Sequence, residues 1–212
     1  MRVCPFLVYS FGDKNNVYNL NYIYRQKNKK KMMIKSIQNL TLTALMAAVI
    51  CIAGPIVIPI GMVPMSFANM AIYLTIILLD KKKATISVAV YLLIGFVGLP
   101  VFSGFTGGAG KVFGPTGGYL IGYLALSWIA GMILEKGKFS GMKERTKQVI
   151  ALIIGTIGLY LFGTLWLMYQ SNLDFVTALS MGVVPFVVFD IIKIVAASVM
   201  GMSIKRRISF MI

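Results

Sequence analysis

Six apolar runs, separated by short segments that are alternately rich and poor in basic residues, constrain this chain more than any other feature of its sequence. A helix needs roughly 20 apolar residues to cross the hydrocarbon core of a bilayer. In water such runs would stay exposed, because a chain of 212 residues that is 58% hydrophobic has too little polar surface to cover them. We therefore predict an all-α, polytopic membrane protein with six transmembrane helices.

The predicted spans differ in length and in how they end. The third is short and runs into Gly98-Leu99-Pro100, and a stretch without charge, residues 54–64, follows the first. The approximate limits of the six spans are 36–54, 65–79, 84–97, 116–134, 149–169 and 180–203.

The distribution of positive charge predicts the topology. Nineteen of the 21 Lys and Arg residues lie in the N-terminal tail, the second and fourth connections and the C-terminal tail. Short loops rich in Lys and Arg remain cytoplasmic, so we expect a multi-pass protein of the cell membrane with both termini in the cytoplasm. The net charge of +15 thus results from the membrane topology. We expect the chain to associate with the lipid bilayer and not with nucleic acid.

The first 32 residues mix Asn, Tyr and Lys without a helical apolar period, and we expect them to be a disordered basic tail. Two readings stay open: a solvated cytoplasmic tail, or a chain whose translation begins at Met32 or Met33. The predicted organisation is a tail (1–32), a six-helix membrane domain that binds a substrate (33–207) and a short C-terminal tail (208–212).

Two charged residues, Asp190 and Lys193, lie inside the sixth predicted span. Spaced at i and i+3, they share one face of a helix and can point into the same cavity. On insertion scales each mid-span charge costs about 2.5 to 3.5 kcal/mol, which makes an intramembrane ionisable pair a candidate functional site. A purely structural ion pair is the alternative.

The third connection, residues 98–120, contains eight glycines among 23 residues. Glycine allows positive φ angles and close approach of the backbone to a ligand, and Phe102, Phe105 and Tyr119 offer flat apolar walls. The segment is not a nucleotide-binding P-loop, because Gly110-Lys111 would need glycine at Phe105 and a hydroxyl at Val112. We expect it to line a cavity; a re-entrant structural connector is the alternative.

Further candidates lie on the second and first spans. Asn69, near the outer end of the second span, offers both a donor and an acceptor, to a ligand or to another helix. Ala44 and Ala48 lie among small residues on the first span, where they favour close helix packing or the docking of a partner subunit. The chain has no histidine, and we expect no metal, no cofactor and no catalytic residues.

Four short segments are distinctive in their order and spacing: Val63-Pro64-Met65-Ser66, Gly98-Leu99-Pro100-Val101-Phe102, Gly114-Pro115-Thr116-Gly117-Gly118-Tyr119, and Pro185-Phe186 followed by Asp190 and Lys193. Together they resemble the BioY family, the biotin-specific substrate-binding subunits (S components) of energy-coupling factor (ECF) transporters. The resemblance extends over about residues 33–207, and the glycine-rich run that ends at Tyr119 is its most specific part.

The resemblance implies a six-helix S-component fold with an outward biotin pocket capped by the first and third loops. It implies partners: a transmembrane coupling subunit and two cytoplasmic ATPase subunits, with ATP-driven uptake. In the family, the residues equivalent to Asp190 and Lys193 contact biotin. The chain departs from the family at Ala68-Asn69, where Gln-Thr often stands, and Asn69 is expected to replace the lost amide. The substrate-binding residues expected on this basis and from the reasoning above are Asp190, Lys193, Asn69, Tyr119, Phe102, Phe105, Thr116 and Gly117.

Three alternatives remain at the level of the sequence. Asp190 could relay protons in a secondary transporter, and the pair alone does not distinguish biotin from another vitamin. The third alternative, an intramembrane enzyme, would have to work without a His for a Ser–His pair and with one buried Asp where a dyad needs two.

Overall fold

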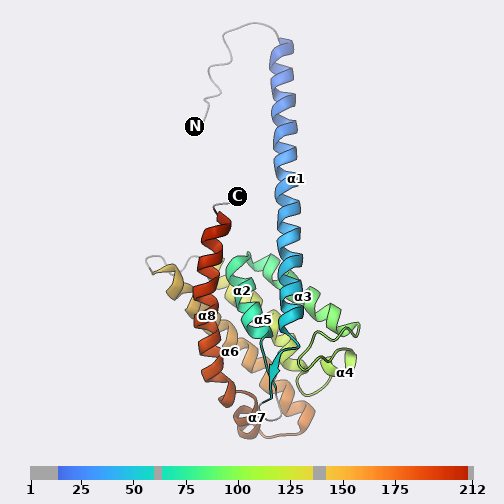
Figure 1. The fold of residues 1–212 in the computed structure, drawn as a ribbon, viewed down its shortest axis with the longest axis vertical. Coiled ribbons are helices and arrows are strands. Elements are labelled where there is room, and N and C mark those ends of the chain that lie inside the picture. Colours follow the sequence, from blue (N-terminus) through green and yellow to red (C-terminus); the bar gives the residue numbers. More distant parts are fainter. Residues whose placement is uncertain (1–13, 60–63, 136–141, 210–212) are drawn as a thin grey trace. The chain divides into compact units, whose positions relative to one another are not determined.

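The computed structural model describes residues 14–59, 64–135 and 142–209, and most of them are helical (Figure 1). The chain divides into two compact units, Met1–Thr41 and Leu42–Ile212. Helix α1 (Lys14–Ala53) begins in the first unit and ends in the second.

In the first unit, residues 14–32 are helical where the sequence led us to expect disorder. The reason is local: no Gly or Pro occurs between Gly12 and Gly54-Pro55, so nothing in the backbone interrupts a helix that the apolar part of α1 continues. Side chains 24–38 are all exposed, so tertiary packing does not explain the helix there. Residues 1–13 lie outside the described part of the chain.

The second unit contains the other helices, and with the end of α1 it confirms the predicted six-helix membrane fold. The five further long helices are α2 (Ala68–Leu78), α3 (Lys81–Phe96), α5 (Gly117–Glu135), α6 (Glu144–Ser171) and α8 (Val184–Ser209). Two short helices, α4 (Ala109–Val112) and α7 (Phe175–Gly182), precede α5 and α8.

Among the described residues, four helical segments are long and apolar enough to cross a membrane: Tyr24–Ala53, Gly117–Glu135, Glu144–Ser171 and Phe175–Arg207. Helices α2 and α3 are shorter. At 1.5 Å per residue, α2 spans about 16 Å, half of a bilayer core. Seven of its eleven residues are buried, because it packs against α8, α5 and α3 instead of facing lipid.

A two-stranded hairpin precedes α2. β1 (Val57–Ile58) pairs antiparallel with β2 (Met65–Ser66), so the second predicted span begins three residues later than expected. The Ser66 hydroxyl donates to the Gly54 carbonyl oxygen (2.8 Å) and accepts from the Ala68 amide (2.9 Å). These bonds connect the end of α1, the hairpin and the start of α2.

The sixth predicted span, 180–203, is not one helix. The chain leaves helical geometry at Val183 (φ −128°, ψ −55°), between α7 and α8. Pro185 explains the break, since it lacks an amide proton and its ring restricts the preceding residue, so it fits only the first turn of α8.

Candidate binding site

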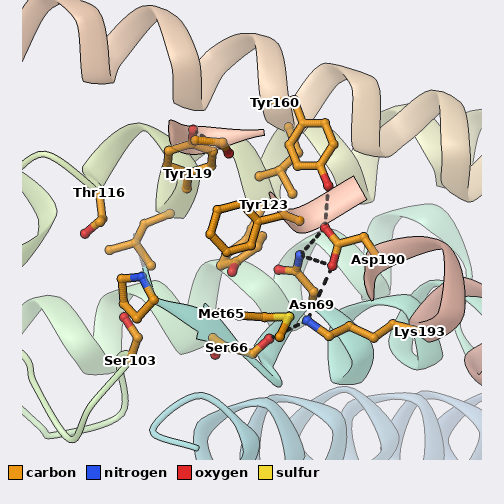
Figure 2. A pocket seen from close by; sticks show the side chains of 15 residues that line it. Met65, Ser66, Asn69, Ser103, Thr116, Tyr119, Tyr123, Tyr160, Asp190 and Lys193 are labelled. Atoms are coloured by element: carbon orange, nitrogen blue, oxygen red, sulfur yellow. Dashed lines mark hydrogen bonds and ion pairs between the residues drawn. The ribbon is translucent and has the colours of Figure 1, made fainter. Parts of the chain in front are cut away.

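A cavity opens where the hairpin and the glycine-rich loop meet α2, α5, α6 and α8 (Figure 2). Ser66 and Ser103 border it from the two loops, and Asn69, Tyr160 and Asp190 border it from three helices. The described residues that line it are Pro64, Met65, Ser66, Asn69, Ser103, Thr116, Tyr119, Leu120, Tyr123, Leu159, Tyr160, Gly182, Phe186, Asp190 and Lys193.

Asp190 and Lys193 lie one turn apart on the same face of α8, as their spacing predicts. The Lys193 ammonium lies 3.3 Å from Asp190 Oδ1, and the two residues are 8% and 3% exposed. The ammonium also donates to the Ser66 carbonyl oxygen at 3.0 Å. The pair is thus buried, and hydrogen bonds compensate for much of the cost of removing it from water.

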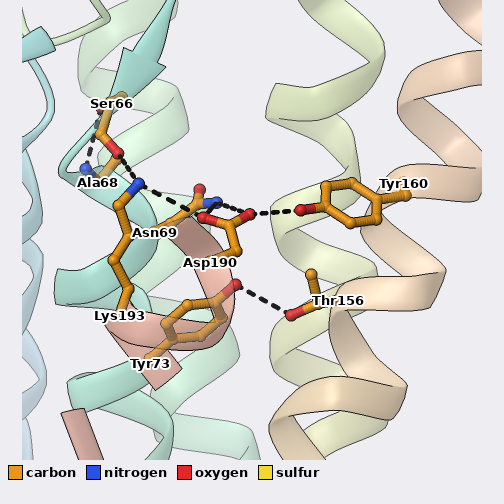
Figure 3. A network of polar contacts seen from close by, with 8 residues as sticks. All are labelled: Ser66, Ala68, Asn69, Tyr73, Thr156, Tyr160, Asp190 and Lys193. Carbon is orange, nitrogen blue, oxygen red and sulfur yellow. Dashed lines mark hydrogen bonds and ion pairs between the residues drawn. The ribbon is translucent and has the colours of Figure 1, made fainter. Parts of the chain in front are cut away.

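Two neighbouring helices supply further donors to the Asp190 carboxylate (Figure 3). From α2, Asn69 Nδ2 lies 3.3 Å from Oδ1 and 3.2 Å from Oδ2. From α6, the Tyr160 hydroxyl donates to Oδ2 at 2.7 Å. A carboxylate has about four lone-pair sites, so these contacts and Lys193 leave Asp190 little capacity for another donor.

The orientation of the Asn69 amide follows from the carboxylate beside it. A flipped amide would place its oxygen against two acceptor oxygens, so Nδ2 must face Asp190. Asn69 Oδ1 is then buried with no hydrogen-bond partner among the described residues. Such atoms are rare in folded proteins, and this one belongs to a side chain that lines the cavity.

The cavity therefore offers a ligand an acceptor beside a donor. The acceptor is Asn69 Oδ1, and the donor is the ammonium of Lys193, which has three protons and two described acceptors. A neutral group with an N–H next to a carbonyl, such as an amide or a urea, complements this arrangement.

Tyr119 and Thr116 also line the cavity, as expected, but Tyr119 has a second role. Its hydroxyl donates to the Gly182 carbonyl oxygen at 3.0 Å. A Cβ atom at Gly163 or at Gly182 would overlap the Tyr119 side chain. The side chain thus fits between α6 and α7 and connects the start of α5 to the end of α7.

Three predicted site residues do not line the cavity. Phe102 is completely buried in the core, edge-on to Tyr91 with 5.5 Å between ring centroids. Phe105 is 71% exposed and has φ +57°, so the loop turns its ring outward. At Gly117, a Cβ atom would overlap the Val112 carbonyl oxygen, so this glycine allows α4 to pack against α5. Composition alone cannot separate a core ring or a packing glycine from a ligand contact.

The sequence interpretation missed Tyr160 and Tyr123, both of which line the cavity. A signal for Tyr160 was present: Thr156, Tyr160 and Thr164 recur every four residues and so share one face of the fifth span. Both threonines are buried, which identifies this face of α6 as the one that points inward.

Ala44 and Ala48 lie on the exposed face of α1, away from this cavity. Their neighbours Thr43 and Ala47 are buried, and the Thr43 carbonyl oxygen accepts from Ser87 on α3 at 2.8 Å. The small-residue segment therefore has two faces. Thr43 and Ala47 pack within the chain, and Ala44 and Ala48 form an exposed face.

No group of three or more His, Cys, Asp or Glu residues occurs among the described residues. Among the described residues that line the cavity, the charged groups are one carboxylate and one ammonium.

Comparison with known proteins is consistent across sequence and structure. The sequence model of the BioY family matches residues 26–210. A biotin transporter BioY2 from Lactococcus lactis is 35% identical, with 84% of this chain and 96% of the relative covered. A biotin transporter BioY from Thermotoga maritima is 38% identical, with 75% and 90% covered. The crystal structure of an S-component for biotin from an ECF-type ABC transporter matches with a TM-score of 0.75 and 34% identity, covering 81% of this chain and 93% of that one.

Proposed function

The chain belongs to the BioY family, and from this premise we propose that it is the membrane subunit that captures biotin outside the cell for ATP-driven uptake by an ECF-type transporter. In this role the chain binds its substrate and carries out no chemistry on it. The substrate-binding domain is the six-helix part of the chain, residues 33–207.

The observation that carries the proposal is the polar cluster of Asn69, Asp190 and Lys193 in a cavity among membrane helices. The ureido ring of biotin has N–H groups on either side of a carbonyl. One N–H donates to Asn69 Oδ1, the buried acceptor without a partner, and the ureido oxygen accepts from Lys193. Asp190 keeps both residues in place and supplies the compensating negative charge.

The apolar part of biotin lies against the remaining cavity wall. The aromatic and aliphatic surface of this wall comes from Tyr119, Leu120, Tyr123 and Phe186. Thr116 borders the same part of the cavity. Because Phe102 and Phe105 lie elsewhere, we leave them out of the proposed contact set, and we assign Gly117 to the packing of α4 on α5.

The access route follows from the positive-inside argument. The hairpin borders the cavity through Ser66, and the glycine-rich loop borders it through Ser103. Both segments contain almost no basic residues, which is typical of loops on the outer side of the membrane. These two loops face outward, and both termini lie in the cytoplasm. Biotin thus enters from the outer side.

Transport requires partners, since the sequence has no P-loop with which to bind ATP. We propose a transmembrane coupling subunit and two cytoplasmic ATPase subunits. The exposed face of α1 with Ala44 and Ala48 suits close approach of a partner helix, because small side chains allow two backbones to come together.

A titration of the purified protein with biotin tests the proposal. The Trp166 indole donates to the Gly114 carbonyl oxygen at 2.9 Å, two residues before Thr116 of the cavity wall, so its fluorescence should respond to an occupied site. We expect a saturable change with biotin and none with unrelated vitamins. Saturation with another vitamin and not with biotin would assign this S component a different substrate, and no response to any vitamin would refute capture by this chain.

A further inference from the structure

Among the described residues, Tyr160 makes the shortest hydrogen bond to Asp190. Its hydroxyl lies 2.7 Å from Oδ2, whereas the contacts from Asn69 and Lys193 are 3.2 to 3.3 Å long. An O–H group that donates to a carboxylate at this distance forms a strong, charge-assisted bond. Tyr160 is therefore the best placed of the three donors to fix the carboxylate.

The direction of this bond matters as much as its length. Within the described part of the chain, Tyr160 supplies the only hydrogen bond to Asp190 from α6, and it approaches from the side opposite Lys193 (Figure 3). The terminal torsion of an Asp side chain is soft, so the carboxylate plane is set by its partners. Without the hydroxyl, the carboxylate can rotate toward Asn69 and Lys193.

Such a rotation would reach the ligand-binding groups. Asn69 Nδ2 contacts both carboxylate oxygens, and this contact orients the free acceptor Oδ1. The Lys193 ammonium lies between Oδ1 of Asp190 and the Ser66 carbonyl. A shift of the carboxylate thus moves both the acceptor and the donor that the cavity offers.

The ring of Tyr160 is held independently of its hydroxyl. It packs against a cluster of buried side chains that contains Met65, Leu167, Ala178 and Phe186. Phenylalanine at this position keeps that packing and removes only the oxygen. The substitution is therefore a clean test of the hydrogen bond.

We propose that Tyr160 is a positioning residue, which acts through Asp190 to hold Asn69 and Lys193 in the arrangement that recognises the ligand. This inference rests on the proposed function, since the affinity for biotin is the quantity that shows whether Asn69 and Lys193 are correctly positioned. Its readout is affinity: a disturbed arrangement weakens binding without changing how much protein is folded.

The experiment compares Tyr160→Phe with the wild-type protein by calorimetric titration with biotin and by thermal unfolding without ligand. A hydrogen bond to a charged group corresponds to roughly a tenfold to hundredfold change in an equilibrium constant. We expect Tyr160→Phe to bind biotin at least about tenfold more weakly with an unchanged stoichiometry, and its ligand-free unfolding midpoint to fall by no more than the loss of one hydrogen bond implies, so that the protein is fully folded at the temperature of the titration.

Tyr91→Phe is the matched control. Tyr91 is a tyrosine on α3 that is 1% exposed and does not line the cavity, so the same oxygen is deleted from a buried side chain outside the cavity wall. It should bind biotin with the wild-type affinity. Equal loss in both variants would show a general effect of deleting a buried hydroxyl and would overturn the proposal.

The remaining outcomes are distinct. Tyr160→Phe with wild-type affinity, or with a reduced stoichiometry and unchanged affinity of the folded fraction, would overturn the positioning role. Absence of biotin binding by the wild-type protein would instead remove the proposed function, and this inference with it.

Discussion

At the residue scale, the membrane site is built around one carboxylate that is satisfied from three directions. Asp190 receives donors from α2, α6 and its own helix. Burying such a group without partners would cost several kcal/mol, and removal of either member of a buried ion pair typically costs about 3 to 5 kcal/mol. Asp190 and Lys193 therefore stabilise each other in addition to the role that we propose for them toward a ligand.

Stability and binding can be separated at this pair. Asp190→Asn should lower the unfolding midpoint, because it leaves Lys193 charged and without its counterion. In the double variant with Lys193→Met most of that stability should return, since no charge remains buried. Biotin binding should fall at least about tenfold in both, as measured by titration alongside thermal unfolding.

Asp174→Asn is the control for this pair. Asp174 is an exposed carboxylate that accepts from Thr177 at the start of α7, and its change should leave biotin affinity unaltered. A double variant as unstable as Asp190→Asn, or any variant of the pair with wild-type affinity, would contradict this account.

At the element scale, glycines decide how the third loop meets α5. Gly108 precedes α4 with φ +89°, a conformation that side chains disfavour. Gly117 begins α5 where a Cβ atom would overlap the Val112 carbonyl oxygen of α4. Gly108 thus allows a backbone conformation with positive φ, and Gly117 allows α4 and α5 to pack closely.

Gly117→Ala should force α4 away from α5. The new methyl group would also lie 3.3 Å from Trp166 Nε1, which bonds to Gly114, so this connection should weaken. We expect a lower unfolding midpoint and a shifted Trp166 emission, measured in a Trp128→Phe background.

Gly110→Ala in the same loop serves as the comparison, because a Cβ atom there would meet nothing within 4 Å and its φ is not positive. It should resemble the parent protein in both measurements. Equal effects of the two substitutions would mean that the contact between α4 and α5 is not what requires glycine at position 117.

At the scale of the whole molecule, binding and transport are expected to use different surfaces. The cavity lies among α2, α5, α6 and α8, whereas Ala44 and Ala48 lie on the exposed face of α1. Replacement of both alanines by leucine should keep a partner helix at a distance. We expect normal biotin binding by the purified variant but loss of uptake by cells that contain the coupling and ATPase subunits.

Val195→Leu with Val199→Leu is a suitable control, since these residues form an exposed i, i+4 pair on α8. This variant should bind and transport normally. Undiminished uptake by the alanine variant would exclude the α1 face as the docking surface. Uptake that stops when the proton gradient is collapsed while ATP is maintained would favour a proton-coupled transporter instead.

The sequence by itself determined the environment, the number of longer helices and part of the candidate site. Apolar length fixes whether a segment can enter a bilayer, and a charged pair at i and i+3 must share a helix face, so the six helices and the meeting of Asp190 with Lys193 follow from local pattern. Two predictions from the sequence pattern were wrong. Residues 14–32 are helical because they continue into the apolar part of α1, and the sixth span is interrupted at Val183 because of the geometry of Pro185.

Only the tertiary structure decided which polar groups converge on that pair. Asn69 and Tyr160 lie 121 and 30 residues from Asp190, and no periodicity within one span encodes a contact between spans. It also decided that Phe102 fills the core, that Phe105 turns outward and that Gly117 packs against α4. The physical reason is that an apolar ring or a glycine suits a core, a surface and a binding wall equally well, and only the neighbours that folding brings to it select among them.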